Sequence, residues 1–188
     1  MTNNDIQSAL QALKSGGLIL YPTDTIWGIG CDATLSTAVQ RVVRVKERAD
    51  HKSFVILVSD LDMLEQYVEE VPPMAYSLIE VSDKPLTLVY PEARNLAPEV
   101  VGTDGSVAIR VVNHPFCQDL IRRFGKPIVS TSANRTGAPS PKGCEDIASE
   151  LREQVDYCVS PHLEAPATGQ ASSIIRIALN GAIQIIRN

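Results

Sequence analysis

Short apolar runs alternate with segments of helical periodicity along almost the whole chain. The strand-like runs are 18–21, 26–30, 54–58, 86–90, 107–112, 127–130, 173–177 and 183–187, and the helix-like segments are 6–13, 36–47, 60–70, 114–124 and 143–154. This alternation is typical of an α/β protein. The dipeptide Asn180-Gly181 between the last two runs favours a hairpin, so at least one strand pair is antiparallel. We therefore expect a mixed sheet rather than a purely parallel, doubly wound one.

Composition places the chain among ordinary globular proteins. Its 188 residues are 44% hydrophobic and 21% charged, as expected for a folded chain with one core. Because the sequence holds no repeat or long linker, we expect a single domain over residues 1–188. No stretch approaches the roughly 20 apolar residues of a membrane helix, so we expect no membrane contact. The segment Met1–Asp5 has no feature of a signal peptide, which favours a cytoplasmic protein.

Charge and cysteine usage restrict the kinds of site the chain can carry. The formal net charge of −5 opposes a large non-specific phosphate-backbone footprint, so any contact with nucleic acid should be local. The four cysteines include no C-x-x-C pair, and the three histidines are far apart in sequence. This spacing argues against a structural zinc site. We expect buried free thiols and no metal held by protein side chains.

The segment Tyr21–Gly30 is the first candidate binding element, and it reads YPTDTIWGIG. It is a strand that breaks into a hydroxyl-rich turn and resumes with two glycines. Glycine allows close approach of the backbone to a ligand, and Thr23 and Thr25 offer donors and acceptors. The alternative is a tight strand connection in which these hydroxyls bond only to their own turn.

The second candidate is a basic stretch from Arg41 to Lys52 in an otherwise acidic chain. On an ideal helix Lys46 falls on the apolar stripe, whereas neighbouring arginines fall on the opposite face. A lysine in that position either extends its ammonium to solvent or points it into a cleft. If the helix ends near Lys46, Arg48 can turn back, and the pair becomes a phosphate clamp at the junction between helix and loop.

The third candidate is the stretch Lys126–Ser140, in which a buried strand runs into three hydroxyls, an asparagine and a glycine. Such a composition is typical of a binding loop at the carboxyl end of a strand, although a polar surface loop with Asx and Ser/Thr turns has the same composition. Arg110 is the last candidate, because it lies in an otherwise apolar strand. An arginine there either meets a carboxylate or a phosphate, or alternates outward to solvent.

Taken in order, these segments resemble the YrdC family, whose members make threonylcarbamoyl-adenylate for modification of a tRNA adenosine. The matching segments are Tyr21–Gly30, Lys46-x-Arg48, Pro85–Leu88 with Arg110, Ser130–Asn134, Ser172-Ser173 and Arg187. The resemblance spans nearly the whole chain. It implies a single domain with a twisted, open, mixed α/β sheet and a concave, positively lined cavity for ATP and threonine.

The resemblance also implies roles for individual residues. Lys46 and Arg48 would bind the ATP phosphates and act in catalysis. The nucleotide site would be completed by Ser132, Asn134, Ser140 and Arg187. L-Threonine would be held by Thr23 or Thr25, Arg110 and Ser172. The implied reaction joins threonine, bicarbonate or carbon dioxide, and ATP, with Mg²⁺ accompanying ATP, and the product would pass to separate tRNA-modification proteins.

Four departures from the family pattern resemble the YciO-like branch. Ala49 and Ser53 replace prolines, the segment Ser82–Pro85 replaces Pro-Gly-Pro, and Ser160–Leu163 replaces a Gly-Gly pair. We expect these changes to lie near the nucleotide site. Two other functions remain open on the sequence: a non-catalytic module that binds double-stranded RNA or the ribosome, and a carbamoyl transferase with another acceptor.

Overall fold

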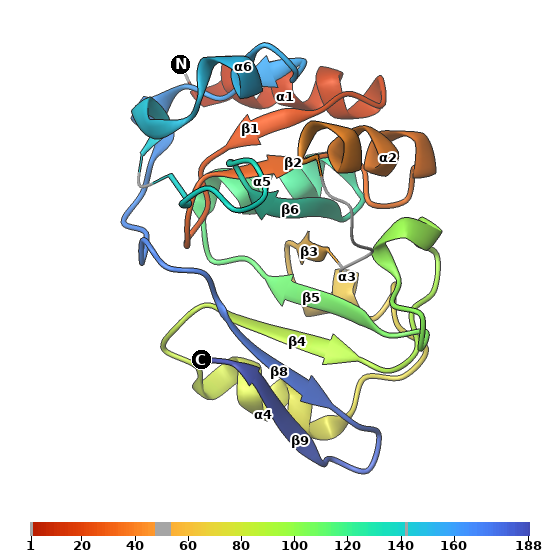
Figure 1. Cartoon of the computed structure of the whole chain (residues 1–188). Coiled ribbons are helices and arrows are strands. Elements are labelled where there is room, and N and C mark those ends of the chain that lie inside the picture. Colours follow the sequence, from red (N-terminus) through yellow and green to blue (C-terminus); the bar gives the residue numbers. More distant parts are fainter. Residues whose placement is uncertain (1, 48–53, 142) are drawn as a thin grey trace.

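The computed structural model describes residues 2–47, 54–141 and 143–188, and its described residues form one nine-stranded sheet (Figure 1). The strands are β1 (Ile19–Tyr21), β2 (Gly28–Gly30), β3 (Val55–Val58), β4 (Leu86–Tyr90), β5 (Val107–Val111), β6 (Ile128–Ser132), β7 (Tyr157–Cys158), β8 (Ser173–Ile177) and β9 (Ile183–Arg187). Their order across the sheet is β7-β1-β2-β6-β3-β5-β4-β8-β9. The expected strands are therefore present.

Strand pairing confirms the mixed sheet. The pairs β1–β7, β3–β5 and β4–β8 are parallel, whereas β1–β2, β2–β6, β3–β6, β4–β5 and β8–β9 are antiparallel. The expected hairpin joins β8 to β9. Gly181 adopts a φ of +82° in its turn, a conformation that glycine reaches without steric cost.

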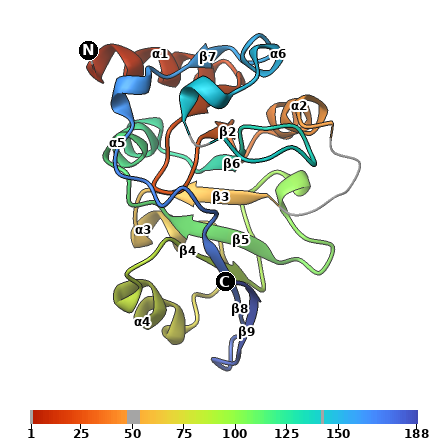
Figure 2. The ribbon, with the colours of Figure 1, turned by 60° about the vertical axis from the view of Figure 1, so that its left-hand side comes forward.

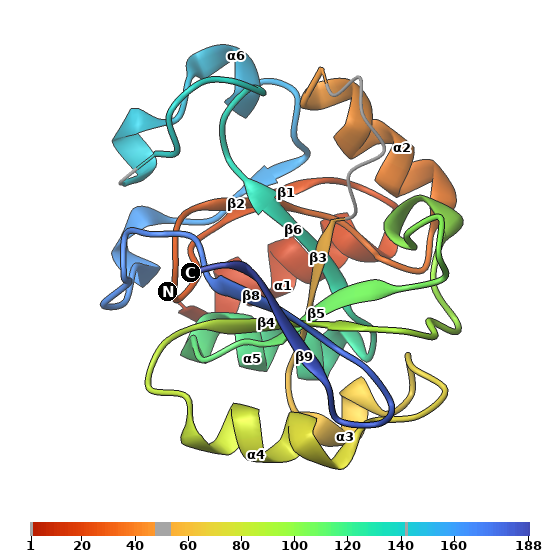
Figure 3. The ribbon, with the colours of Figure 1, turned by 60° about the horizontal axis from the view of Figure 1, so that its bottom comes forward.

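The helices divide between the two sides of the sheet. They are α1 (Thr2–Lys14), α2 (Ser36–Val45), α3 (Leu61–Leu64), α4 (Pro73–Val81), α5 (Pro115–Phe124) and α6 (Ser149–Arg152), with 3₁₀ turns η1 (Pro98–Val100), η2 (Cys144–Asp146) and η3 (Pro161–Leu163). In Figure 3, α3, α4 and α5 lie together on one side of the strands, and α2 and α6 lie on the other. Figure 2 shows that the sheet twists strongly from β1 to β9. No helix among the described residues is long and apolar enough to cross a membrane.

The core fills the space between the central strands and their helices. Ile6, Leu10 and Leu13 of α1 are buried, and α1 packs beside α5, whose Leu120 and Ile121 are also buried. These positions recur at helical spacing, so each helix buries one apolar stripe. Burial of such side chains is worth about 1.5–3 kcal/mol each. The packed helices therefore hold the strands that carry the cavity described below.

Four features of the secondary structure differ from the sequence-based prediction. Helix α4 was not predicted, because its apolar residues surround the helix instead of forming a stripe; Met74 and Val81 are exposed. Strand β7 has only two residues, too few for an alternating pattern. The helix expected over 60–70 is only the four-residue α3, and the one expected over 143–154 divides into η2 and α6.

The pairing of β1 with β2 requires a glycine at position 30. A Cβ atom there would lie 2.6 Å from Tyr21 Cε1 and 2.8 Å from the Val129 carbonyl oxygen. Tyr21 is fully buried, so its ring has little room to move. We predict that Gly30→Ala lowers the free energy of unfolding by about 1–3 kcal/mol, measured by urea denaturation. Gly28→Ala is the control, since its nearest contact would be 3.3 Å; equal losses would contradict the prediction.

Candidate active site

A cavity of about 490 Å³ opens on the side of the sheet opposite α4 and α5. Its walls come from β2, β3, β5, β6, β8, β9 and the segments that join them. The lining residues are Thr25, Ile26, Gly28, Phe54, Val55, Arg110, Ser130, Thr131, Ser132, Ser140, Ala171, Ser172, Ile174, Ile186 and Arg187. This described lining contains two arginines and no acidic side chain. The cavity is therefore cationic in a chain whose net charge is −5.

Arg110 is buried in β5, with a side-chain exposure of 4%, and does not extend to solvent. Its Nη2 lies 3.3 Å from Asp24 Oδ1, and its Nη1 donates to Thr25 Oγ1 at 3.1 Å. The other Asp24 oxygen accepts a hydrogen bond from the Asn113 backbone amide. Burial of a guanidinium is costly without such a partner. Asp24 therefore compensates the Arg110 charge and fixes the direction of its side chain.

The hydroxyls of Thr23 and Thr25 have different surroundings. Thr23 Oγ1 donates to the Ile26 carbonyl at 2.7 Å and accepts from the Thr25 and Ile26 backbone amides. Because its one proton is used, the 2.8 Å bond between the two hydroxyls must be donated by Thr25. Thr23 thus closes the turn, as the alternative interpretation of this segment expected, whereas Thr25 lines the cavity.

Arg187, at the end of β9, and Ser172, just before β8, form the wall of the cavity opposite Arg110. Nε and Nη2 of Arg187 both donate to the Ser172 carbonyl oxygen, at 3.0 and 2.7 Å. The Ser172 hydroxyl bonds to Thr87 Oγ1 at 2.7 Å. Burial, and then the nearby charge of Arg110, lowers the pKa of Arg187 from its usual value. The positive charge of Arg110 therefore acts on Arg187 across the cavity.

Lys46 follows the last residue of α2, so the helix ends where the clamp hypothesis required. Lys46 is buried and does not extend its ammonium to solvent. Its Nζ donates to the Ser132 carbonyl at 2.6 Å and to the Asn134 carbonyl. Thr136 Oγ1 returns a hydrogen bond to the Lys46 carbonyl at 2.9 Å. Lys46 thus ties the end of α2 to the loop after β6, next to the cavity residue Ser132.

The structure brings together most of the site residues expected from the sequence. The cavity is lined by Thr25, Arg110, Ser132, Ser140, Ser172 and Arg187. Thr23, Lys46 and Asn134 adjoin it through the hydrogen bonds described above but do not line it. Arg48, Ala49 and Ser53 lie outside the described residues.

The wall also has an apolar part that was not predicted from the sequence, which includes Phe54, Ile174 and Ile186. Phe54 precedes β3, and the two isoleucines belong to β8 and β9. As ordinary strand residues they carry no local signal of a site.

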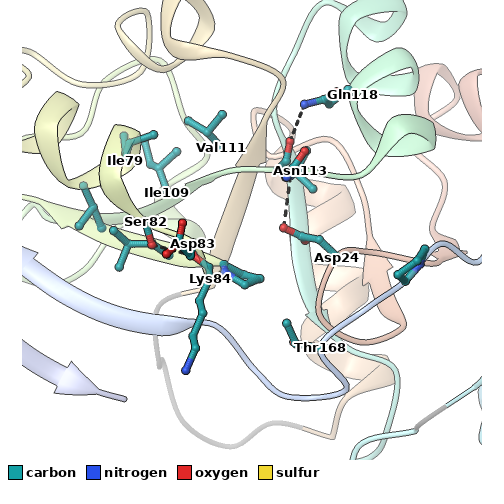
Figure 4. A pocket seen from close by; sticks show the side chains of 15 residues that line it. Asp24, Ile79, Ser82, Asp83, Lys84, Ile109, Val111, Asn113, Gln118 and Thr168 are labelled. Carbon is teal, nitrogen blue, oxygen red and sulfur yellow. Dashed lines mark hydrogen bonds between the residues drawn. The ribbon is translucent and has the colours of Figure 1, made fainter.

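A second cavity, of about 430 Å³, lies on the other side of the sheet (Figure 4). Ile109 and Val111 face it, on either side of Arg110 in the β5 sequence, and Asp24 and Asn113 lie at its edge. The segment Ser82–Pro85 lines this second cavity and not the cationic one. The expectation that this departure lies near the nucleotide site stays a prediction, since the Pro85 carbonyl accepts from the amide of Ser173, which follows the cavity residue Ser172.

The segment Ser160–Leu163 was also expected near the nucleotide site. This segment forms the turn η3 and its beginning packs against α1, where the backbone amide and hydroxyl of Ser160 donate to Asp5 Oδ1 at 2.9 and 2.7 Å. None of its residues lines the cationic cavity. Within the part of the chain that the structure describes, no group of three or more His, Cys, Asp and Glu side chains is arranged to hold a metal ion.

Comparison with known proteins gives a family for this arrangement. The Sua5/YciO/YrdC family model, described as "Telomere recombination", matches residues 11–188. The chain belongs to this family. The expected resemblance is thus confirmed. A family relative named threonylcarbamoyl-AMP synthase, from Pseudoalteromonas translucida, is 34% identical over 182 residues, which are 95% of each chain.

Solved structures of the family have the same fold. Sua5 of P. abyssi complexed with L-threonine superposes with a TM-score of 0.81 at 28% identity, over 92% of this chain and 50% of that chain. The chain thus spans about half the length of that Sua5 protein. E. coli YciO superposes with a TM-score of 0.84 at 22% identity, over 100% of this chain and 90% of that chain. The α/β fold with its open mixed sheet is that of the family.

The different surroundings of the two threonines can be tested by removing each hydroxyl. We predict that Thr23→Val lowers the free energy of unfolding by about 1–3 kcal/mol, because the Ile26 carbonyl and two backbone amides lose a buried partner. Thr25→Val should cost less, since Thr25 makes fewer such bonds. Urea denaturation of both variants measures the difference, and a larger loss for Thr25→Val would refute this assignment.

Proposed function

We propose that this protein is a threonylcarbamoyl-AMP synthase, which joins L-threonine, bicarbonate or carbon dioxide, and ATP, and releases pyrophosphate. The observation that carries the proposal is the cationic, hydroxyl-rich cavity, which collects Thr25, Arg110, Ser172 and Arg187 from distant parts of the chain. Relatives at about one-third identity over nearly the whole chain bear this name and support it.

Arg110 and its neighbours form the amino-acid end of the site in this proposal. A planar guanidinium meets a carboxylate through two parallel hydrogen bonds. Asp24 and Thr25 hold the Arg110 side chain in one orientation, so the binding of threonine costs little conformational entropy at Arg110. Thr25 adds a hydroxyl group in contact with this guanidinium, and Ser172 adds a second hydroxyl to the wall of the same cavity.

The nucleotide occupies the other end of the cavity. Its phosphates would meet Lys46, Ser132, Ser140 and Arg187, together with Asn134 and, by the family resemblance, Arg48. Mg²⁺ would enter with ATP, since it usually keeps several waters and binds through substrate phosphates. The hydroxyl oxygens on the wall suit such a hydrated ion.

The reaction needs positioning and charge stabilisation more than a side-chain nucleophile. The threonine amine first takes up bicarbonate or carbon dioxide to form a carbamate. A carbamate oxygen then attacks the α-phosphorus of ATP, and the bond to the β-phosphate oxygen breaks and releases pyrophosphate. Fixed cations stabilise the charge on the phosphoryl oxygens during this step. Lys46, already held in place by the loop after β6, would act there with Arg48.

We place this reaction in the cytoplasm, where separate tRNA-modification proteins would consume the labile product. A role as a duplex-RNA module fits the cavity less well. Recognition of duplex RNA uses contacts spread along its minor groove, whereas the two arginines described above converge on one cavity of about 490 Å³. Binding to RNA that falls steeply with salt, without threonine-dependent chemistry, would favour that module instead.

Pyrophosphate release tests the proposed reaction directly. The protein is incubated with ATP, Mg²⁺, bicarbonate and L-threonine, and pyrophosphate and threonylcarbamoyl-AMP are measured by a coupled assay and by mass spectrometry. We expect release that depends on threonine, because the carbamate is the attacking group. Reactions without threonine, or with carbamoyl phosphate or another amino acid in its place, are the controls. Release that is the same in all of them would exclude the synthase.

The role of Lys46 is tested by comparing Lys46→Ala with Arg44→Ala. Both variants remove one positive charge from the end of α2, but Arg44 is exposed whereas Lys46 is buried against the Ser132 and Asn134 carbonyls. We predict that Lys46→Ala weakens ATP binding by roughly tenfold or more, equivalent to loss of one charged hydrogen bond. Calorimetry should find Arg44→Ala unchanged. Equal ATP affinity in both variants would remove Lys46 from the site.

A further inference from the structure

Glu164 joins three segments of the chain through one carboxylate oxygen. Its Oε1 accepts a hydrogen bond from the Trp27 indole nitrogen and a second one from the Cys144 backbone amide, at 3.0 Å. The Trp27 side chain is only 2% exposed, so its indole N–H needs an acceptor inside the fold. Glu164 is an exposed residue that supplies this acceptor from the segment after β7.

Each of the three segments that meet at Glu164 also carries a residue of the cationic cavity. These wall residues are Thr25, which precedes Trp27, Ser140, which precedes Cys144, and Ser172, which follows Glu164. In the proposed function Thr25 and Ser172 serve the amino-acid end of the site, whereas Ser140 serves the nucleotide end. The Glu164 carboxylate therefore ties together the segments that build both ends.

The backbone on both sides of Glu164 is itself fixed to the rest of the fold. Glu164 follows the turn η3, whose beginning is anchored to α1 because the Ser160 amide and hydroxyl donate to Asp5 Oδ1. Further along, the Thr168 amide donates to the Asp24 carbonyl at 3.1 Å. The carboxylate is thus presented to its two donors from an anchored segment.

We propose that Glu164 is a positioning residue that holds the two ends of the active site at a fixed separation. This inference rests on the proposed synthase function. In that reaction a carbamate oxygen, formed at the threonine end, must reach the α-phosphorus at the nucleotide end. Since a displacement of about 1 Å can lower a rate on the order of a hundredfold, the separation of the two ends decides the rate of this step. Glu164 acts through Trp27 and Cys144 and contacts neither substrate.

A purely structural role for Glu164 leads to a different expectation. If Glu164 did no more than satisfy the buried indole, its removal would lower the stability of the protein but leave the turnover of the folded enzyme unchanged. The contacts that define each end separately, such as the Arg110–Asp24 ion pair and the Lys46 hydrogen bonds, do not involve Glu164. A positioning role therefore predicts a loss in kcat with little change in the binding of either substrate alone.

The contact itself is tested without any substrate. Because Trp27 is the single tryptophan of the sequence, its indole N–H gives one signal in the NMR spectrum of the isotope-labelled, full-length protein. We expect Glu164→Ala to speed exchange of this proton with water by about tenfold or more, the effect of losing one buried hydrogen bond. Glu164→Gln should keep the exchange slow, since an amide oxygen accepts the same two hydrogen bonds. Equal exchange rates in the unsubstituted protein and in Glu164→Ala would overturn the proposal.

The positioning role is tested by steady-state kinetics and calorimetry on the same variants. We expect Glu164→Ala to lower kcat by roughly tenfold to a hundredfold, while the affinities for ATP alone and for threonine alone change by less than about threefold. Glu164→Gln should restore turnover. Glu153→Ala is the control, since it removes the same charge from an exposed position that does not line the cavity.

Two kinetic outcomes would overturn the proposal. One is an unchanged kcat in Glu164→Ala; the other is a loss confined to the affinity for one substrate, because Glu164 would then serve one end only. If Glu164→Ala folds poorly, Glu164→Asp replaces it, since its side chain is one methylene shorter and cannot reach both donors. An unsubstituted protein without threonine-dependent pyrophosphate release refutes the synthase itself, whereas equal turnover of that protein and Glu164→Ala refutes only the positioning role.

Discussion

The ion pair between Arg110 and Asp24 organises the rest of the site. A guanidinium in the middle of a central strand would be expensive to bury alone, and Asp24 supplies the compensating charge from the turn between β1 and β2. This turn depends on Thr23, because the Thr23 hydroxyl makes all of its described hydrogen bonds to residues of the same turn. The Asp24 and Thr25 carbonyls also accept from the Thr168 and Gly169 amides, which places the segment that leads to Ser172. The turn that supplies Asp24 thus contacts both β5 and the segment that leads to Ser172.

The sequence predicted the class of fold and the chemical character of the site, because both leave local patterns. Alternating apolar runs located the strands, and Asn180-Gly181 located the final hairpin. The lysine on the apolar stripe of α2 and the arginine within β5 stood out as residues that need partners. The order of the strands had no such signal. Strand β6 pairs with both β2 and β3 across large sequence separations, and nothing within its own residues specifies these partners.

The sides of the sheet were the second feature that the sequence left open. Successive residues of β5 face opposite ways, so Arg110 points into the cationic cavity while Ile109 and Val111 face the second one. The segment Ser82–Pro85, which is close to a matching strand in sequence, therefore lines the second cavity and not the cationic one. The sequence did not distinguish the role of Thr23 from that of Thr25 for a similar reason. Only the directions of their hydroxyl hydrogen bonds show that Thr23 closes the turn and that Thr25 lines the cavity.

The charge of the cavity explains how an acidic protein can be suited to an anionic ligand. The Arg110 charge is compensated by Asp24, whereas Arg187 donates both of its described hydrogen bonds to the Ser172 carbonyl. Burial, and then the charge of Arg110, lowers the pKa of Arg187. The ligand-free site therefore holds two cations whose mutual repulsion is only partly screened by water. A bound anion relieves that repulsion. The anion itself loses water, and the hydroxyl groups that line the cavity take the place of that water. Because such a ligand binds only the folded state, its binding stabilises the protein. Part of this stabilisation comes from removing the repulsion between Arg110 and Arg187.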